Sequence, residues 1–417
     1  MLYHANAQKD LHDVFIDNFK GTSQEDSFNV QEKKDRPFHK IRRDSTDTIL
    51  YQNGNNIPFN IGLCLPFLED SVYSEEAFDQ SFYVSNAQIN GAFDFYAGAY
   101  IAFDSLRKAH DFLNLYIFDS SIDTFNIDSL LKDSNLIKMN MIIGPLFKKY
   151  FKKTIRFCDS NQIYSISPAK TAINYNSKYY RKSTAPINSY YDTIAQIITQ
   201  RYDSSRQKVF ITPDKKSKSF LKHKPLFDSV PNLKYISGSR PTIDEILDSS
   251  TIYVDEDTIK YLLGRLDHRI LFINSTDESF VYKIFSELDR VKDFAIHFTV
   301  IGLPNWENFE SIHIRYYDNF NVIFGSNFWV NYKSKEVTNF RKKYIQLFKK
   351  EPSKYAYLGF DNLFFHVNDL LHLTKNGRWK GLTTSYKMAT FEENQLFKEN
   401  SYFHLLQFMN GQIIKLK

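Results

Sequence analysis

Residues 139–171 constrain the fold more than any other part of this sequence. An apolar run ends at Gly144-Pro145, and a second run, 163–166, ends at Ser167-Pro168. Both endings are typical of buried strands, because glycine adopts dihedral angles closed to other residues and proline has no N–H to donate to a sheet. The segment between them, 146–157, has helical spacing. This order predicts a strand, a crossover helix and a second, parallel strand.

The loops after these two strands are the first candidate binding elements. Parallel neighbouring strands end at the same edge of a sheet, and in open α/β sheets ligands bind at that edge. The first loop begins with Gly144-Pro145-Leu146, and the second runs from Ser167 to Thr171. We therefore expect these loops to lie side by side.

The length of 417 residues exceeds one ordinary core and predicts two domains with an extension. Residues 1–56 are polar and mixed in charge, so we expect an arm or linker there. The net charge of +5 comes from 53 basic and 48 acidic residues scattered along the chain, which argues against nucleic acid as a partner. No stretch has the ~20 consecutive apolar residues of a membrane span.

From residue 59 onward, short apolar runs alternate with segments of helical spacing. The strands expected in the first half cover residues 60–65, 113–121, 139–143 and 163–166, and the helices cover 91–109, 127–136 and 146–157. This order is a β-α-β-α-β-α-β unit of Rossmann-like type.

The second half repeats the alternation. Strands are expected at 208–212, 233–237, 269–274 and 297–302, and the clearest helix, 277–291, follows the capping-box-like STDE. Residues 244–266 are expected to be helical, with TIYV as an alternative strand. We expect 321–331 to form a strand that crosses back to the first half, followed by two helices within 335–373 and closing strands within 386–416.

The sequence carries no recognisable catalytic or metal-binding motif. HExxH, GxxxxGKS, GxGxxG, GxSxG and CxxC are all absent. His366 and His372 are six residues apart, which does not place them together on a helix for a metal. For Cys64 and Cys158 we favour two buried thiols, with a disulfide as the alternative. We therefore expect a protein that is not an enzyme and that uses no metal or cofactor.

Three groups of residues resemble the type I periplasmic binding proteins, the bilobed family that includes branched-chain amino-acid binding proteins of ABC importers. The first is IIGPLF followed by SISPAKT, which resembles the family's Gly-Pro and Ser-Pro-x-x-Thr loops. The second is the helix FYAGAYIAFDSL with a following strand that closes on Asp119. The third is FRKKYIQLFKKEPSKYAYLGFD, which is similar to the family's FxxxYxxxFxxxPxxxAxxGYD, with Phe360 where tyrosine is usual. Together they span about residues 60–373.

This resemblance implies an α/β fold with two Rossmann-like doubly wound lobes joined by three crossing strands. Such a clamshell closes on its ligand by hinge motion. The boundaries expected here are an arm at 1–56, lobe one at 57–185 and 320–385, and lobe two at 186–319 and 386–417.

The resemblance also implies which residues bind ligand. They are Pro145, Leu146, Ser167 and Thr171 in lobe one, and Ser275, Thr276 and Trp306 in lobe two. Thr171 stands where the family has a hydroxyl that helps bind the charged groups of an amino acid. The residues themselves leave another interpretation open, in which the hydroxyls cap helices and Trp306 packs under a loop.

Three departures make the amino-acid site incomplete. Phe147, Lys148 and Lys149 follow the Gly-Pro loop where amino-acid binders usually have a serine. The first strand of lobe two is followed by TPDKKSKS rather than by Tyr-Gly. GLPNW lacks the glutamate that would serve as the pocket acid.

The leading hypothesis is a non-catalytic protein of the periplasm or cell envelope. It would bind a small polar, amino-acid-like ligand between its lobes and deliver it to an ABC permease. The alternative is a ligand-free interaction or scaffold protein that regulates or assembles an envelope complex. Its partner would be a peptidoglycan-associated protein of peptidoglycan synthesis, or an outer-membrane machine. Either role expects a signal sequence or anchor outside this chain.

Overall fold

The computed structural model describes most of the chain from residue 51 onward. The described ranges are 51–52, 55–56, 58–67, 87–120, 124–168, 173–201, 207–212, 218–230, 233–237, 251–253, 268–290, 297–374 and 377–416. The arm expected at 1–56 lies outside these ranges except for two short strands, β1 (Tyr51–Gln52) and β2 (Asn55–Asn56), which pair antiparallel.

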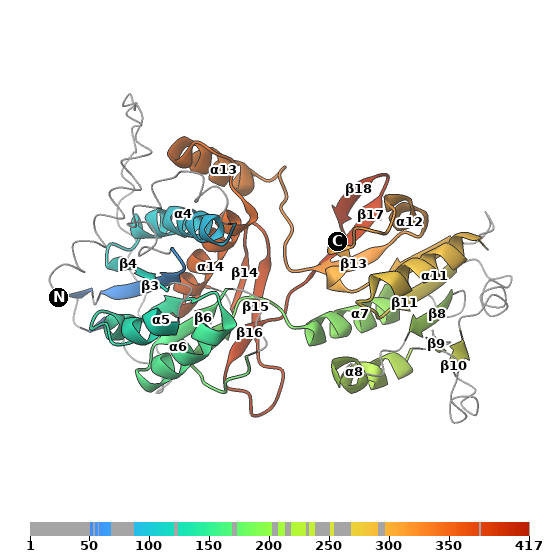
Figure 1. Ribbon diagram of the computed structural model, residues 1–417, viewed down its shortest axis with the longest axis horizontal. Helices are drawn as coiled ribbons and strands as arrows, with labels where there is room; N and C mark the ends of the chain where they lie inside the picture. The colour runs from blue at the N-terminus through green and yellow to red at the C-terminus, as the bar shows by residue number, and fades with distance from the viewer. Residues whose placement is uncertain are drawn as a thin grey trace. The chain divides into compact units, whose positions relative to one another are not determined.

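The first of two large sheets is built mainly from the N-terminal part of the chain (Figure 1). Its strands are β3 (Phe59–Leu65), β4 (Leu113–Asp119), β5 (Met141–Ile143), β6 (Tyr164–Ser167), β7 (Tyr180–Lys182), β14 (Arg378–Lys380), β15 (Ser385–Ala389) and β16 (Lys398–Asn400). They lie in the order β14-β15-β16-β7-β6-β5-β3-β4. β4, β3, β5 and β6 are mutually parallel, which confirms the parallel pairing predicted for β5 and β6.

Helices cover both faces of these parallel strands, which explains why nearly every residue of β3, β5 and β6 is buried. The helical segments are α4 (Ala87–Arg107), α5 (Thr124–Leu130), η2 (Leu136–Lys138), α6 (Lys148–Ser160), α13 (Lys335–Phe348) and α14 (Lys354–Leu370). Leu63 faces a core shared with α4 and α14, whereas Cys64, the next residue, faces a core that contains Cys158 of α6. The alternation along β3 therefore builds two separate cores.

The second sheet has the order β10-β9-β8-β11-β12-β13-β17-β18. Its strands are β8 (Gln207–Thr212), β9 (Leu233–Ser237), β10 (Thr251–Tyr253), β11 (His268–Ile273), β12 (His297–Ile301), β13 (Ile323–Ser326), β17 (His404–Met409) and β18 (Gln412–Lys415). The strands from β10 to β13 in this order are parallel to one another, whereas β17 pairs antiparallel with both β13 and β18.

Two expectations change in this sheet. TIYV does contribute a strand, because β10 pairs with β9, while the remainder of 244–266 lies outside the described residues. The strand expected at 321–331 is shorter, because β13 pairs with β12 and β17 and ends at Ser326, and from residue 332 the chain belongs with the first sheet, as the expected crossing requires. The apolar pattern identified a buried strand correctly, but it does not specify which strands lie beside it.

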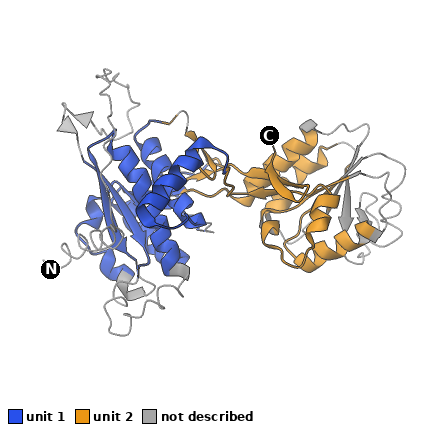
Figure 2. Cartoon of the chain, turned by 90° about the horizontal axis from the view of Figure 1, so that it is seen from above, with its two compact units in different colours: residues 1–181, 332–373, 394–397 blue, residues 182–331, 374–393, 398–417 orange. Residues whose placement is uncertain are grey.

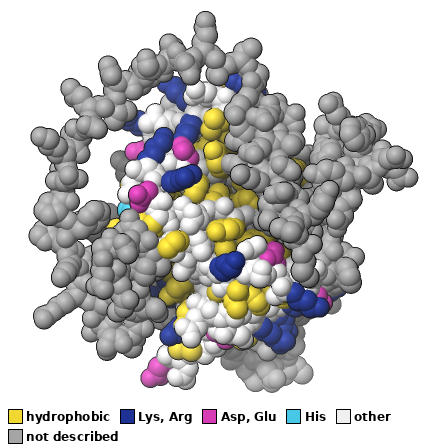
Figure 3. Space-filling model, turned by 90° about the vertical axis from the view of Figure 1, so that its left-hand side faces the viewer, with side chains coloured by type: hydrophobic (Ala, Val, Ile, Leu, Met, Phe, Trp, Pro, Cys, Tyr) yellow, Lys and Arg dark blue, Asp and Glu magenta, His cyan; other side chains and the backbone are white. Residues whose placement is uncertain are grey.

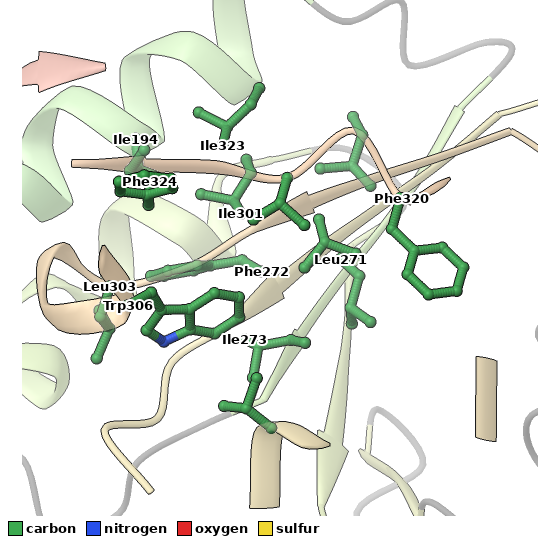
Figure 4. Close-up of a cluster of buried hydrophobic side chains, with 14 of the residues drawn as sticks. Ile194, Leu271, Phe272, Ile273, Ile301, Leu303, Trp306, Phe320, Ile323 and Phe324 are labelled. Carbon is green, nitrogen blue, oxygen red and sulfur yellow. The ribbon is translucent and has the colours of Figure 1, made fainter. Parts of the chain in front are cut away.

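Aromatic side chains dominate the core around the second sheet. The surrounding helices are α7 (Ile187–Arg201), α8 (Lys218–Asp228), α11 (Glu278–Arg290), η3 (Pro304–Asn308) and α12 (Ile314–Asn319). Phe272 of β11 contacts Tyr191 of α7 and Phe227 of α8, with ring centroids 6.3 and 5.6 Å away. Phe285 of α11 stacks on Phe320 at 5.6 Å. Figure 4 shows the buried side chains between β11, β12 and β13.

The chain divides into two compact units (Figure 2). Unit 1 comprises residues 1–181, 332–373 and 394–397, and unit 2 comprises 182–331, 374–393 and 398–417. They differ from the predicted lobes at 182–185, 320–331, 374–385 and 394–397.

The surface of the described residues is mixed in charge. On the face drawn in Figure 3, basic and acidic side chains are interspersed with hydrophobic ones. Within the described ranges, no helix has the length and apolar character needed to cross a bilayer.

Candidate functional site

The carboxyl ends of β3, β4, β5 and β6 lie along one edge of the first sheet, and two of the predicted site loops start there. Gly144 follows β5 with a φ of 93° and is joined to Pro145 by a cis peptide bond. Its N–H donates to the Ile166 carbonyl oxygen at 3.0 Å. A Cβ at this position would lie 2.2 Å from the Cys64 carbonyl oxygen. The turn therefore requires glycine to pack against the end of β3.

The structure brings three of the four predicted site residues of unit 1 to neighbouring strand ends. Pro145 and Ser167 are buried, with Ser167 only 3% exposed. Leu146 is half-buried and packs against the core beneath α4. Thr171 lies outside the described residues. A role in ligand contact remains a prediction for all four.

Asp119, which ends β4, binds the neighbouring loop of its own unit. Its Oδ1 accepts a hydrogen bond from the Phe67 backbone N–H at 2.9 Å. The next residue, Ser120, donates its backbone N–H to the Leu65 carbonyl oxygen at 2.9 Å. These two bonds join the ends of β3 and β4.

The two cysteines are free and buried, which is the interpretation that the sequence favoured. Burial raises the pKa of the Cys158 thiol to about 12. Burial also raises the pKa of Cys64, and the nearby Asp119 carboxylate raises it further. Since the thiolate is the nucleophile, neither residue is a reactive cysteine at neutral pH.

The second sheet has a corresponding edge where β11, β12 and β13 end. Ser275 and Thr276 follow β11, and Thr276 is exposed. The cap of α11 is Asp277, whose Oδ1 accepts the backbone N–H groups of Ser279 at 3.0 Å and Phe280 at 3.3 Å. The Ser275 hydroxyl accepts the Asp277 N–H at 3.1 Å. The STDE sequence therefore does start a helix, with the cap two residues later than its serine.

Trp306 is a core residue, with 1% of its surface exposed (Figure 4). Its indole N–H donates to the Ser275 carbonyl oxygen at 3.0 Å, and its own carbonyl oxygen accepts the Tyr317 hydroxyl at 3.1 Å. The ring lies against Gly302, where a Cβ would be 2.2 Å from the ring. Trp306 thus packs beneath its loop and ties the end of β12 to the end of β11.

Glu307 supplies the acidic group that the sequence analysis did not find. It is exposed and follows Trp306 directly in η3. Its Oε2 lies 2.9 Å from the hydroxyl of Ser326, the last residue of β13. That hydroxyl also lies 2.8 Å from the Phe328 carbonyl oxygen, and it can donate to one of the two at a time. The signal in the sequence was a carboxylate five residues after the end of the strand predicted at 297–302.

Tyrosines of α7 hold this edge to the helix. Tyr191 donates its hydroxyl to Asn274 Oδ1 at 2.9 Å, just after β11. Tyr190 donates its hydroxyl to the Gly302 carbonyl oxygen, just after β12. The Tyr190 ring covers Gly325 of β13, where a Cβ would lie 2.5 Å from the ring. The polar groups deepest in the edge are therefore bonded within the chain.

The described residues contain no group of three or more His, Cys, Asp and Glu side chains placed to hold a metal ion. The groups available at the two edges include hydroxyls and the exposed carboxylates of Asp277 and Glu307, which can form hydrogen bonds. Such groups bind and orient polar ligands.

Comparison with known proteins gives matches at the level of structure. No family model matches the sequence, and no curated protein matches it. An ABC transporter substrate-binding protein from Desulfitobacterium hafniense, in complex with Leu, matches with a TM-score of 0.50 and 12% identity over 86% of this chain and 100% of its own. A branched-chain amino acid ABC transporter protein from Rhodospirillum rubrum matches with a TM-score of 0.57 and 11% identity over the same shares.

The chain has the type I periplasmic-binding-protein fold. The same fold is found in the C-domain of LpoA from Haemophilus influenzae, a regulator of PBP1A, which matches with a TM-score of 0.50 and 12% identity over 86% of this chain and 100% of that domain. The match confirms the predicted family resemblance and fold class. At 11–12% identity, these matches concern the fold.

Proposed function

We propose that this chain is a non-catalytic envelope protein that binds a small polar, amino-acid-like ligand through its strand-end loops. The observation that carries the proposal is the exposed Glu307 carboxylate beside the Ser326 hydroxyl, at neighbouring ends of β12 and β13. Thr276 adds an exposed hydroxyl at the end of β11, the next strand of the sheet. Carboxyl edges of open α/β sheets are where such folds bind ligands.

The chemistry of Glu307 favours a ligand with an ammonium group. A carboxylate has no donor and accepts charge-assisted hydrogen bonds, which are about twice as strong as neutral ones. The Ser326 hydroxyl can turn from Glu307 to the Phe328 carbonyl and so release a lone pair of Glu307 to a ligand. Pro145, Leu146, Ser167 and Thr171 of unit 1, with Ser275, remain the proposed further contacts.

A thermal-shift screen against amino acids, amino sugars, nucleosides and peptidoglycan fragments tests this function. A ligand present at 100 times its Kd adds about 2.7 kcal/mol to the free energy of unfolding. We expect a ligand with an ammonium group to raise the melting temperature. Glu307→Gln should reduce its affinity about tenfold or more, because a hydrogen bond to a charged group contributes roughly 1.5–3 kcal/mol.

Glu310→Gln is the matched control, since Glu310 is also exposed and lies three residues further along. The Glu310→Gln variant should bind the ligand with the same affinity as the unmodified chain. If every compound leaves the melting temperature unchanged, the small-ligand proposal is wrong.

A second candidate is a regulatory or scaffold protein of an envelope complex. The observation that favours it is that Asp119, Asn274 and the Trp306 indole N–H are all hydrogen-bonded inside the chain. Polar groups already bonded in this way have less to offer a small ligand. This candidate predicts direct binding to a purified peptidoglycan synthase in a surface-plasmon assay, with no change caused by Glu307→Gln.

A further inference from the structure

A groove of about 470 Å³ is lined by residues of unit 2. One wall is formed by α7 and the end of α8, and the other by β15 and the residues after it. The lining includes Ser189, Asp192, Thr193, Gln196, Thr199, Ser229, Lys387, Phe391 and Ser401. Its volume falls in the range of small-molecule sites, roughly 300–1,000 Å³.

α7 turns different faces to the core and to the groove. Tyr191, Ile194 and Ile198 are buried against the second sheet. Asp192 and Thr199, one residue further along in each case, line the groove. Because helical residues three and four apart share a face, the groove side of α7 is continuous and polar.

Several hydroxyls that line the groove have already used their protons, whereas that of Ser189 has no hydrogen-bond partner among the described residues. Thr193 donates to the Ser189 carbonyl oxygen at 2.7 Å, and Thr199 donates to the Ala195 carbonyl oxygen at 2.8 Å. Ser229 likewise donates to a carbonyl oxygen of α8, at 2.7 Å. A carbonyl oxygen can only accept, so each hydroxyl must be the donor and keeps lone pairs for other partners.

Ser401, on the opposite wall, also donates its hydroxyl proton to a carbonyl oxygen. Its hydroxyl donates to the Lys387 carbonyl oxygen at 2.9 Å. Both walls of the groove therefore offer hydrogen-bond acceptors that a ligand with several donors can use, beside the donors of Ser189, Gln196 and Lys387.

The charged groups of the groove also favour a ligand that brings hydrogen-bond donors. The Asp192 side chain is 40% exposed and carries a carboxylate into the lining. Its Oδ1 lies 3.5 Å from His223 Nε2, while His223 Nδ1 lies 2.6 Å from the Ser219 carbonyl oxygen. Leu226 and Ser229 bring the C-terminal end of α8 to the groove, and that helix has no basic residue in its last turn. A helix C-terminus carries partial negative charge.

Two lysines of α8 form ion pairs with acidic side chains. Lys222 pairs with Glu392 at 3.1 Å, and Lys224 pairs with Asp228 at 3.0 Å. Lys387 borders the groove on the β15 wall and is exposed. Asp192 and the C-terminal end of α8 thus lie on one wall of the groove, and the Lys387 ammonium borders the other.

We propose that this groove is a second binding site, for a small organic cation that carries several N–H donors, such as a polyamine or an amino sugar. Asp192 takes the ammonium group, and the hydroxyl lone pairs of Thr193, Thr199 and Ser229 accept its N–H donors. The site does not depend on the ligand proposed for the strand-end edge.

Isothermal titration of the full chain with spermidine, glucosamine and choline tests the site. Spermidine or glucosamine should bind, and choline should bind at least about tenfold more weakly, because it keeps the charge but has no N–H donors, and tenfold corresponds to about 1.4 kcal/mol. Asp192→Asn should lower the affinity for the amine about tenfold or more. Thr199→Val, at an exposed position, should weaken spermidine severalfold and provides a second variant if Asp192→Asn fails to fold.

Asp128→Asn is the matched control, because Asp128 is an exposed carboxylate of α5 in unit 1. It should leave amine binding unchanged. The proposal is overturned if neither amine binds, if choline binds as well as the amines, or if Asp192→Asn binds them normally. If Glu307→Gln loses amine binding and Asp192→Asn keeps it, the amine binds at the strand-end edge. That result overturns the proposal of a site in the groove and supports the proposed function.

Discussion

His404 and His366 are single residues that make stability depend on pH, one in each unit. Burial, together with the nearby Lys415 ammonium, lowers the pKa of His404 to about 4. Its Nε2 lies 2.7 Å from the Thr383 carbonyl oxygen, so Nε2 carries the proton of the neutral ring. Burial lowers the pKa of His366 to about 3. Both imidazoles are therefore neutral in the folded chain at mildly acid pH.

The unfolded chain binds protons at these histidines below a pH of about 6.5, whereas the folded chain does not. The contribution of these histidines to the free energy of unfolding should therefore be constant above pH 6.5. The free energy of unfolding should fall as the pH drops from 6.5 towards 4. Each histidine should cost about 2 kcal/mol at pH 5. Urea denaturation at a series of pH values measures this, and His404→Gln should make the slope between pH 6 and pH 4.5 shallower. An unchanged slope would show that His404 is protonated in the folded chain.

Arg181 and Asp369 form a buried ion pair that joins β7 to α14 in unit 1. Their side chains are 8% and 11% exposed, and the guanidinium also lies over the Tyr164 ring at 5.1 Å. Removal of one partner leaves the other charge buried and unpaired. Asp369→Asn should therefore lower the free energy of unfolding by roughly 3–5 kcal/mol in urea denaturation. The double variant Arg181→Met with Asp369→Leu should recover most of this loss, and a failure to recover would indicate that the hydrogen bonds matter more than the charge.

The sequence predicted which candidate loops follow strand ends, but not how the side chains of these loops are oriented. Ser275 and Trp306 do lie at neighbouring strand ends, yet the indole N–H bonds to the Ser275 carbonyl and faces the core. Glu307 was one residue beyond the segment considered. Whether a side chain faces solvent or core in an irregular loop depends on distant contacts, here with Phe285 and Tyr317, which local spacing does not encode.

Among the elements, α4 and α14 make the closest helix contact in unit 1, and small residues permit it. A Cβ at Gly98 would lie 1.7 Å from the Ala356 carbonyl oxygen, and one at Gly359 would lie 1.9 Å from the Phe95 carbonyl oxygen. The two backbones touch where the sequence places its paired small residues. This contact was predictable, because glycine within a helical pattern indicates a close approach.

Gly98→Ala should therefore separate the two helices, although alanine is the better helix former. We expect it to lower the free energy of unfolding by roughly 2–4 kcal/mol, since overpacking against backbone cannot be relieved by a rotamer change. Gly91→Ala in the same helix is the control: its Cβ would meet only the Tyr355 ring at 3.2 Å. Gly91→Ala should change stability by less than about 1 kcal/mol. Equal effects of the two variants in chemical denaturation would contradict this account of the contact.

The strands show where a sequence pattern stops being informative. β9 (Leu233–Ser237) occurs within the residues predicted, because a short apolar run between turn residues is a strong local signal. β13 was also found, but it was assigned to the other half of the chain. Its neighbours β12 and β17 are fixed by pairing between distant segments, which one strand's composition does not reveal.

For the whole molecule, the order of strands and helices was enough to predict two doubly wound units, and the matches to solved structures bear this out. The groove beside α7 was not predictable, since its acceptors arise from hydroxyls whose protons are taken by helix carbonyls and from a strand nearly two hundred residues later. Such a site exists only in the folded chain.

The central claim is that this chain binds polar ligands and does not transform them. Native mass spectrometry of the full chain, incubated with a pool of amino acids, amines and peptidoglycan fragments, tests it most directly. We expect a non-covalent adduct whose added mass equals that of an unmodified member of the pool, and an unchanged composition of the free pool. A pool member that is consumed while a new mass accumulates would contradict the claim, and the absence of any adduct would remove its support in ligand binding.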